Sequence, residues 1–216
     1  MRNAHSPQAT PLRARIAQRG RTWSCPAHPG RGTPKLSAVA GELRQAEIDY
    51  IIDRVRLKIV APIAWEVEGA HVKARVLVEA ATSDLGNVRL TMDLTVNRNL
   101  PGKYTYQLRQ APAFVCLRRL DVRGTHTNRK HTGSDESWKR RTHKHAFRDA
   151  CGDAFAYTPT DIPDTGSPSN SPDPREHELV FEAFCTECGI EVGGNWVDPP
   201  LESGAGPSAS LPDWPT

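Results

Sequence analysis

Side chains that could perform chemistry gather in one segment of the chain, between Arg119 and Tyr157. This segment holds four of the eight histidines, the pair Arg119 and Asp121, and the repeat His143-x-His145. Imidazole groups change charge near neutral pH, so they serve as general acids, general bases and metal ligands. We therefore expect any activity of this chain to arise from this segment.

The alternation of side chains along a strand predicts that several of these groups meet. In an extended chain Arg119 and Asp121 lie on one face, and so do His143 and His145. If the two strands are neighbours in a sheet, the four side chains converge, with His126 held over them by the connecting loop. These five residues form the predicted catalytic set.

Three kinds of chemistry fit this set. His126 and one of His143 or His145 could act as base and acid in metal-free RNA cleavage. Arg119 would then stabilise the transition state, and Asp121 would orient a histidine.

Alternatively, the three histidines, His126, His143 and His145, with or without Asp121, could bind Zn²⁺ or Mn²⁺. In a third reading the side chains bind a phosphate backbone or only stabilise the fold. We predict a toxin-like ribonuclease without a cofactor. The alternative is a non-enzymatic module of a mobile element that binds nucleic acid or protein.

The same segment is strongly basic. Between residues 118 and 148 ten Lys and Arg residues accompany only three acidic ones, although the whole chain has a formal net charge of only +3. Basic clusters attract the phosphates of nucleic acids, so RNA is the expected partner. The residues predicted to contact it are Arg123, Asn128, Arg140, Arg141 and Lys144.

Periodic patterns predict the elements that position the segment. Apolar residues at helical spacing predict an amphipathic helix over 42–55. After Pro62, residues 65–68 are expected to be extended. Alternation predicts strands over 72–82 and 88–97, joined as a hairpin, and further strands follow over 103–110, 113–122, 142–147 and 153–157. A closing helix over 173–188 ends before Gly189. The predicted fold is α+β, with a mostly antiparallel sheet of five or six strands and a helix at each end.

Cysteine pairs raise the question of a second metal site. Cys185 and Cys188 lie in the apolar stripe of the closing helix with Phe181 and Phe184, so we expect buried apolar side chains rather than ligands. Cys25 and His28 lack a second ligand pair at zinc-finger spacing. An odd total of five cysteines favours a reducing compartment.

Composition predicts the domain limits and the location. Pro, Arg, Gly and Ser are frequent at the start of the chain, and Pro, Gly and Ser at its end. We therefore expect a disordered extension over 1–40, one α+β domain over 41–192, and a disordered tail over 193–216. The start has no apolar signal core, and no apolar run could span a bilayer. We therefore predict a cytoplasmic protein that does not bind membranes.

The order of these motifs resembles a known family. The order is Arg119-Leu120-Asp121, His126-x-Asn128 and His143-x-His145, then Gly152-Asp153 before Phe155-Ala156, and lastly the run FEAFCTECGI. It is similar to an uncharacterised bacterial and phage domain-of-unknown-function family over about residues 42–192. A weaker likeness to TumE-like toxins of toxin–antitoxin systems implies a presumed ribonuclease with an antitoxin or other protein partner. Thr125, Arg129, Thr142 and Phe155 depart from the family pattern.

Overall fold

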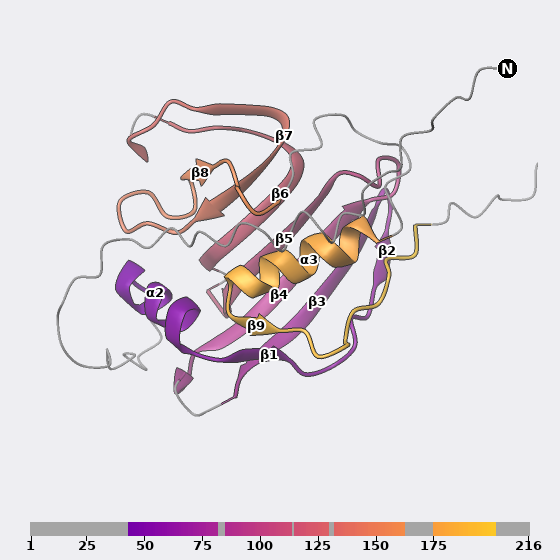
Figure 1. Ribbon diagram of the computed structural model, residues 1–216, viewed down its shortest axis with the longest axis horizontal. Coiled ribbons are helices and arrows are strands. Elements are labelled where there is room, and N and C mark those ends of the chain that lie inside the picture. The colour runs from indigo at the N-terminus through magenta and orange to yellow at the C-terminus, as the bar shows by residue number, and fades with distance from the viewer. Residues whose placement is uncertain (1–42, 82–84, 114, 130–131, 163–174, 202–216) are drawn as a thin grey trace, which may run out of the picture.

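The computed structural model describes residues 43–81, 85–113, 115–129, 132–162 and 175–201 (Figure 1). Within them lie two helices, α2 (Gln45–Arg54) and α3 (Glu176–Glu187). The strands are β1 (Leu57–Ile59), β2 (Glu66–Glu68), β3 (His71–Ala80), β4 (Arg89–Asn97), β5 (Tyr104–Ala111), β6 (Val115–Thr127), β7 (Ser137–Ala146), β8 (Ala156–Tyr157) and β9 (Ile190–Glu191).

All nine described strands belong to one sheet. Eight follow the order β8-β7-β6-β5-β4-β3-β1-β9, and β2 pairs separately with β3. The pairing is antiparallel except between β1 and β9. The α+β class and the mostly antiparallel sheet are confirmed, but the predicted five or six strands were too few. β2 lies in the stretch 65–68 that was expected to be extended. The unpredicted strands β1 and β9 have only three and two residues, too few for a periodic pattern.

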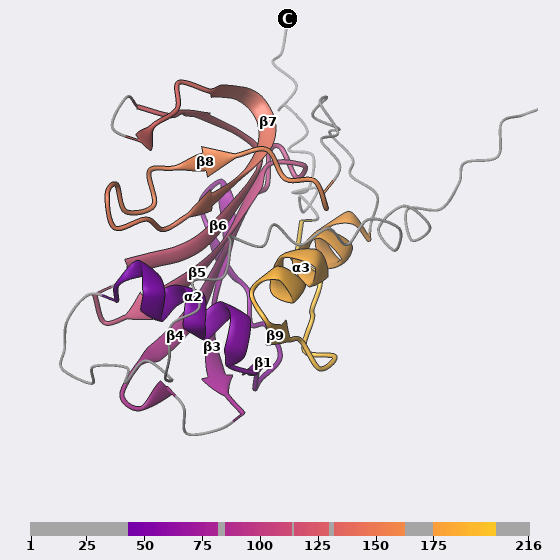
Figure 2. The same ribbon diagram turned by 60° about the vertical axis from the view of Figure 1, so that its left-hand side comes forward.

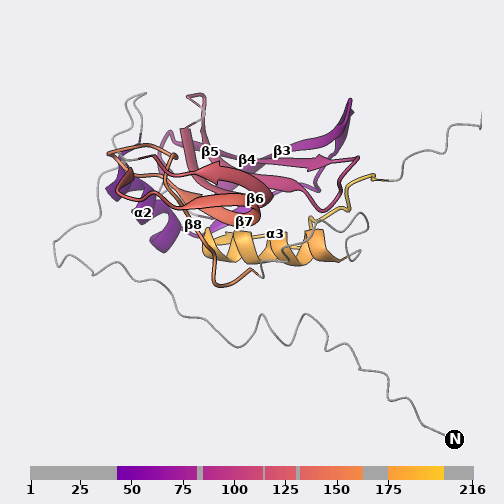
Figure 3. The same cartoon turned by 90° about the horizontal axis from the view of Figure 1, so that it is seen from above.

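Both helices cover the same face of the sheet (Figure 3). The apolar stripe of α2, with Ile48, Ile51 and Ile52, is buried as its spacing predicts. The ring of Phe181 on α3 meets that of Tyr106 on β5 edge to face, with 5.3 Å between centroids. The hydrophobic core therefore lies between this face and the two helices.

The predicted hairpin and the end of the closing helix are confirmed. Val72 of β3 lies opposite Val96 of β4 in an antiparallel ladder. Gly189 follows α3 with φ of +67°, the left-handed conformation that favours glycine after a helix. Cys185 and Cys188 are fully buried in the core, as the apolar stripe predicts. Residues 173 and 174, the predicted start of this helix, lie outside the described residues.

The opposite face of the sheet is polar and carries the histidine segment. On β7, Lys144 pairs with Glu187 of α3, so Lys144 lies on the helix side. Because side chains alternate, His143 and His145 lie on the side away from the helices. Asp121 of β6 stands directly opposite His143 in the sheet. The pairing of β6 with β7 therefore brings these side chains together.

The arm formed by β6 and β7 is longer than predicted (Figure 2). The stretch expected to be a loop continues β6 as far as Thr127, and β7 begins at Ser137. The ladder slips twice, between Asp121 and Gly124 and between Gly124 and Thr125. Such irregularities increase the local twist and redirect side chains. They break the regular alternation, which explains why this part of the strand escaped prediction.

The chain after residue 192 is not a free tail over its first part. Asn195 donates through Nδ2 to the carbonyl of Ile59 at 2.8 Å and accepts from the amide of Ile63 at 3.0 Å. The ring of Trp196 lies 4.9 Å from that of Phe181. Asn195 and Trp196 therefore pack against the domain, beyond the predicted boundary at 193. The predicted extension over 1–40, with Cys25 and His28, and residues 202–216 lie outside the described residues.

Candidate functional site

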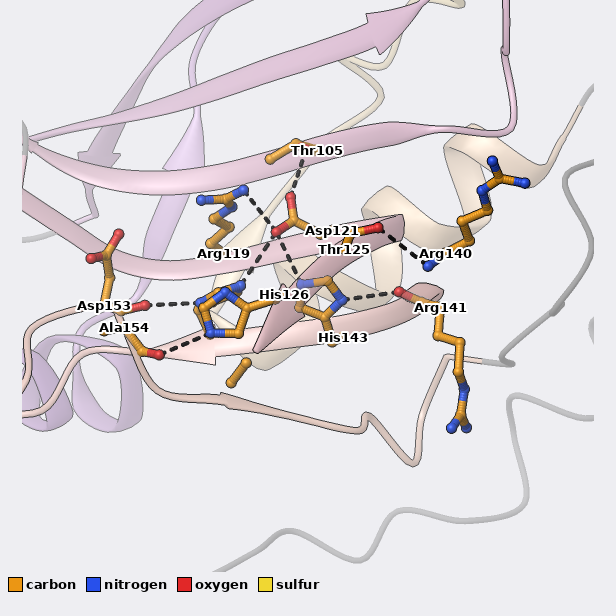
Figure 4. A network of polar contacts seen from close by, with 12 residues as sticks. Thr105, Arg119, Asp121, Thr125, His126, Arg140, Arg141, His143, Asp153 and Ala154 are labelled. Carbon is orange, nitrogen blue, oxygen red and sulfur yellow. Dashed lines mark hydrogen bonds and ion pairs between the residues drawn. The ribbon is translucent and has the colours of Figure 1, made fainter. Parts of the chain in front are cut away.

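The polar side chains of the site converge on one carboxylate oxygen (Figure 4). Asp121 Oδ2 lies 2.8 Å from Arg119 Nη2, 3.3 Å from His145 Nε2 and 3.4 Å from His143 Nε2. The other oxygen, Oδ1, accepts a hydrogen bond from Thr105 Oγ1 at 2.7 Å. Four of the five residues in the predicted set are therefore in direct contact.

Backbone carbonyls orient both of these imidazole rings. His143 Nδ1 lies 2.9 Å from the carbonyl oxygen of Arg141, and His145 Nδ1 lies 2.8 Å from that of Asp153. A carbonyl oxygen only accepts, so we infer that each Nδ1 carries a hydrogen. In the neutral ring, Nε2 then presents a lone pair toward Asp121. Histidine ligands of metals are commonly fixed in this way.

The two Nε2 atoms approach the carboxylate without a hydrogen bond to it. Neither has a hydrogen-bond partner among the described residues, although both rings are buried. Atoms about 2.0–2.1 Å from a tetrahedral Zn²⁺ lie about 3.3–3.4 Å from one another. The distances of 3.3 and 3.4 Å to Asp121 match this spacing, and the three ligand atoms lie within 4.8 Å of one another. Asp121, His143 and His145 could therefore hold a metal ion.

The electrostatics of the site keep Asp121 charged. Burial by itself raises the pKa of this carboxyl. The contacts with His143 and His145, the charge of Arg119 and the hydrogen bond from Thr105 lower this pKa by more than burial raises it. The resulting pKa lies well below its usual range, so Asp121 offers an anionic oxygen at neutral pH.

His126 lies beside this group but on a strand rather than in a loop. It belongs to β6 and stands opposite Trp138 of β7, which corrects the predicted loop position. Its ring centroid is 4.6 Å from that of His145 and 5.7 Å from that of His143. Its Nε2 lies 3.1 Å from the carbonyl oxygen of Ala154. Partial burial and the neighbouring histidines lower its pKa, so the ring is neutral at pH 7.

Three of the residues predicted to contact nucleic acid are buried and bonded inside the protein. Arg123 donates to the carbonyl of Gly102 at 2.6 Å. Asn128 exchanges two hydrogen bonds of 2.9 Å with the backbone of Ala156. Lys144 pairs with Glu187 and Asp161. We therefore do not assign these three side chains to a nucleic-acid contact.

The remaining two predicted contacts, Arg140 and Arg141, are exposed on β7. Their side chains point outward, away from the buried cluster (Figure 4). They do not reach into the site.

Three further residues at the site were not predicted from the sequence. Thr105 comes from β5 and stands opposite Asp121. Trp138 stacks on His143 with 5.5 Å between ring centroids, and its Nε1 donates to Thr158 Oγ1 at 2.9 Å. Gly124 occupies the slip in the ladder. Only the pairing of β5 with β6 could have identified Thr105, and no local pattern predicts that pairing.

Gly124 is required by the close packing of the cluster. A Cβ atom at this position would lie 2.7 Å from Asp121 Cβ and 2.8 Å from His143 Cε1. We expect Gly124→Ala to lower the free energy of unfolding by about 1–3 kcal/mol, the usual cost of overpacking. Urea denaturation measures it. Lys139→Ala, at an exposed position of the facing strand, is the control and should change stability by less than about 0.5 kcal/mol. Equal effects would contradict the packing argument.

Fold and site together define an α+β domain with a buried aspartate and histidine cluster on the polar face of its sheet. A family model matches residues 43–190, and the chain belongs to this family, a family of unknown function named DUF6978. The resemblance to a domain-of-unknown-function family is thereby confirmed. No curated protein and no solved structure matches the chain. Neither described helix is long and apolar enough to cross a membrane.

Proposed function

We propose that Asp121, His143 and His145 bind a divalent metal ion of the zinc class, and that the protein uses this ion in hydrolysis. The observation that supports this proposal is the convergence of two Nε2 atoms and one carboxylate oxygen at ligand spacing. Two lone pairs facing a carboxylate repel one another unless a cation or a proton lies between them. A metal ion satisfies all three atoms.

Burial favours a metal over the metal-free ribonuclease predicted from the sequence. The His143 side chain is 0% exposed and the His145 side chain 3% exposed. A general acid or base must reach the proton that it transfers on the substrate. Two rings enclosed in this way are better placed to hold an ion than to contact RNA. If the substrate is RNA, its cleavage would then depend on the metal ion, and Arg140 and Arg141 would contact the RNA at the protein surface.

The donor set favours catalysis over a purely structural role. Catalytic zinc sites usually have three protein ligands and leave a position for water, whereas structural sites have four. A bound zinc ion lowers the pKa of that water to about 7. His126, neutral at pH 7 and next to the cluster, would accept the proton released.

A structural metal is the second candidate, because the histidines are so deeply buried. In that case the ion would hold the β6–β7 arm to residues 153 and 154, whose carbonyls bond His145 and His126. A protein partner such as an antitoxin follows only from the weaker resemblance to toxins.

Metal analysis tests the proposal directly. After loading with zinc and removal of the excess, we expect about one zinc ion per wild-type chain by plasma mass spectrometry. His143→Ala and His145→Ala should each abolish this retention. His71→Ala, a histidine on β3 outside the cluster, is the matched control and should retain zinc. Failure of the wild-type protein to bind zinc, manganese or cobalt would refute the metal site.

Activity separates the catalytic role from the structural one. We expect the zinc-loaded protein to hydrolyse RNA or bis(4-nitrophenyl) phosphate and to lose this activity with a chelator. His126→Ala should lower kcat by about 100-fold or more, as for a general base, with its zinc content unchanged. A zinc-loaded protein without hydrolytic activity, whose unfolding temperature falls when zinc is removed, would instead support the structural role.

A further inference from the structure

A depression of about 340 Å³ lies beside the cluster, on the same polar face of the sheet. Its polar lining comes from Gln107 and Arg109 of β5, Arg119 of β6 and Asp153. Gln107 stands directly opposite Arg119 in the ladder. Its volume is at the lower end of the range for small-ligand sites. The depression therefore brings two guanidinium groups and a side-chain amide to one place.

Arg119 connects this depression to the candidate metal site. Its Nη2 contacts Asp121 Oδ2, while its Nε is buried with no hydrogen-bond partner among the described residues. A guanidinium group has five N–H donors in a fixed plane. Arg119 can thus contact Asp121 on one side and still offer donors to a ligand on the other.

The charges around the depression are balanced without a metal. Arg75 and Arg109 pair with Asp93 at 2.7 and 3.2 Å, and Arg119 pairs with Asp121 at 2.8 Å. Asp153 adds a further acidic group to the lining. A divalent ion on Asp121 would add two positive charges next to Arg119, so the depression would favour an anion only once the metal is bound.

We propose that this depression is a phosphoryl-binding subsite, in which Arg109, Arg119 and Gln107 hold the phosphate of a phosphate-ester substrate beside the metal. The inference rests on the proposed metal centre. The paired N–H donors of an arginine guanidinium group match the oxygens of phosphate in geometry and charge. In the reaction a water oxygen bonds to phosphorus, and the bond from phosphorus to the ester oxygen breaks. The water loses one proton to His126, and the departing alkoxide takes up a proton from solvent water.

Binding of inorganic phosphate to the full chain tests the subsite without any need for turnover. Isothermal titration of the zinc-loaded protein should show binding that weakens about tenfold or more in Arg119→Gln and in Arg109→Gln, each of which loses a charged donor. Lys73→Gln removes the same charge from β3 of the same sheet face and should leave the affinity unchanged. Removal of zinc should weaken binding by about fivefold or more, a typical coupling between two sites.

Asp153→Asn is expected to strengthen phosphate binding, and misfolding would not produce such a gain. It removes the acidic side chain of the depression and keeps the backbone carbonyl that bonds His145. We expect it to strengthen phosphate binding about threefold or more, because a repulsive charge is lost. Unchanged affinity in Asp153→Asn, together with equal affinities in Arg109→Gln and Lys73→Gln, would overturn the subsite.

The two proposals fail in different ways. A protein that binds zinc but shows no arginine-dependent phosphate binding overturns the subsite and leaves the metal centre intact. A protein that binds no metal overturns the proposed function and the metal dependence stated here. Arginine-dependent phosphate binding in that protein would still support the depression as an anion site.

Discussion

Replacement of Asp121 with alanine is expected to lower the free energy of unfolding of the metal-free protein by about 3 kcal/mol. The carboxylate is buried and pairs with Arg119 at 2.8 Å, and its other oxygen accepts from Thr105. Removal leaves a guanidinium group and a hydroxyl without their acceptor. Because the Arg119 side chain is 35% exposed and can turn toward water, the cost lies at the lower end of the range for broken buried ion pairs. Urea denaturation in the presence of a chelator measures it.

A double-mutant cycle shows whether this loss comes from the ion pair. Arg119→Ala and the double variant Arg119→Ala/Asp121→Ala complete the cycle. We expect the double variant to be less destabilised than the sum of the two single variants, since the partner of each lost group is also gone. Additive losses would show that the pair contributes nothing, and an unchanged stability in Asp121→Ala would contradict the assigned role of Asp121.

A second large effect on stability is expected from the titration of His177, which lies on α3 away from the cluster. Its ring is buried against Tyr104 of β5, with 4.5 Å between centroids, and neither ring nitrogen has a hydrogen-bond partner among the described residues. Burial lowers the pKa of His177 to about 4, from its ordinary value of 6.5. Among the nearby charges, Asp198 raises this pKa and Arg123 of β6 lowers it.

The folded protein should therefore lose stability in mild acid. Above pH 6.5 His177 is neutral in both states and adds no pH dependence. Below pH 6.5 His177 becomes protonated in the unfolded chain, whereas in the folded protein it stays neutral until about pH 4. The free energy of unfolding therefore falls by about 1.4 kcal/mol per pH unit over this window. Between pH 7 and pH 5 the wild-type protein should lose about 2 kcal/mol more than His177→Leu. Urea denaturation at both pH values measures this difference, and parallel losses in the two proteins would contradict it.

Much of the fold follows from short-range patterns in the sequence. The stripe of Ile48, Ile51 and Ile52 predicts α2, and the alternation over 88–97 predicts β4. Gly189 marks the end of α3. These features depend on which residues share a face of one helix or strand, which residue spacing alone determines.

The site was predictable as two separate pairs. Strand alternation places Arg119 with Asp121, and His143 with His145. Whether the pairs meet depends on the register of β6 against β7, in which Asp121 lies opposite His143 and Arg119 opposite His145. The position of His126 depends further on two slips in that ladder. Spacing along the chain does not contain this information.

The sequence by itself determined that the residues suited to chemistry gather in one histidine-rich and basic segment, and which of its side chains share a face. Only the tertiary structure decided which charged residues converge in the buried cluster, which are paired inside the protein and which remain at the surface. Lys144 and Arg123 look like surface cations in the sequence, yet Lys144 meets Glu187 of α3 and Arg123 meets Glu176. A charged side chain is buried only where the fold supplies a partner, and here the partners come from a helix more than 40 residues away in the chain.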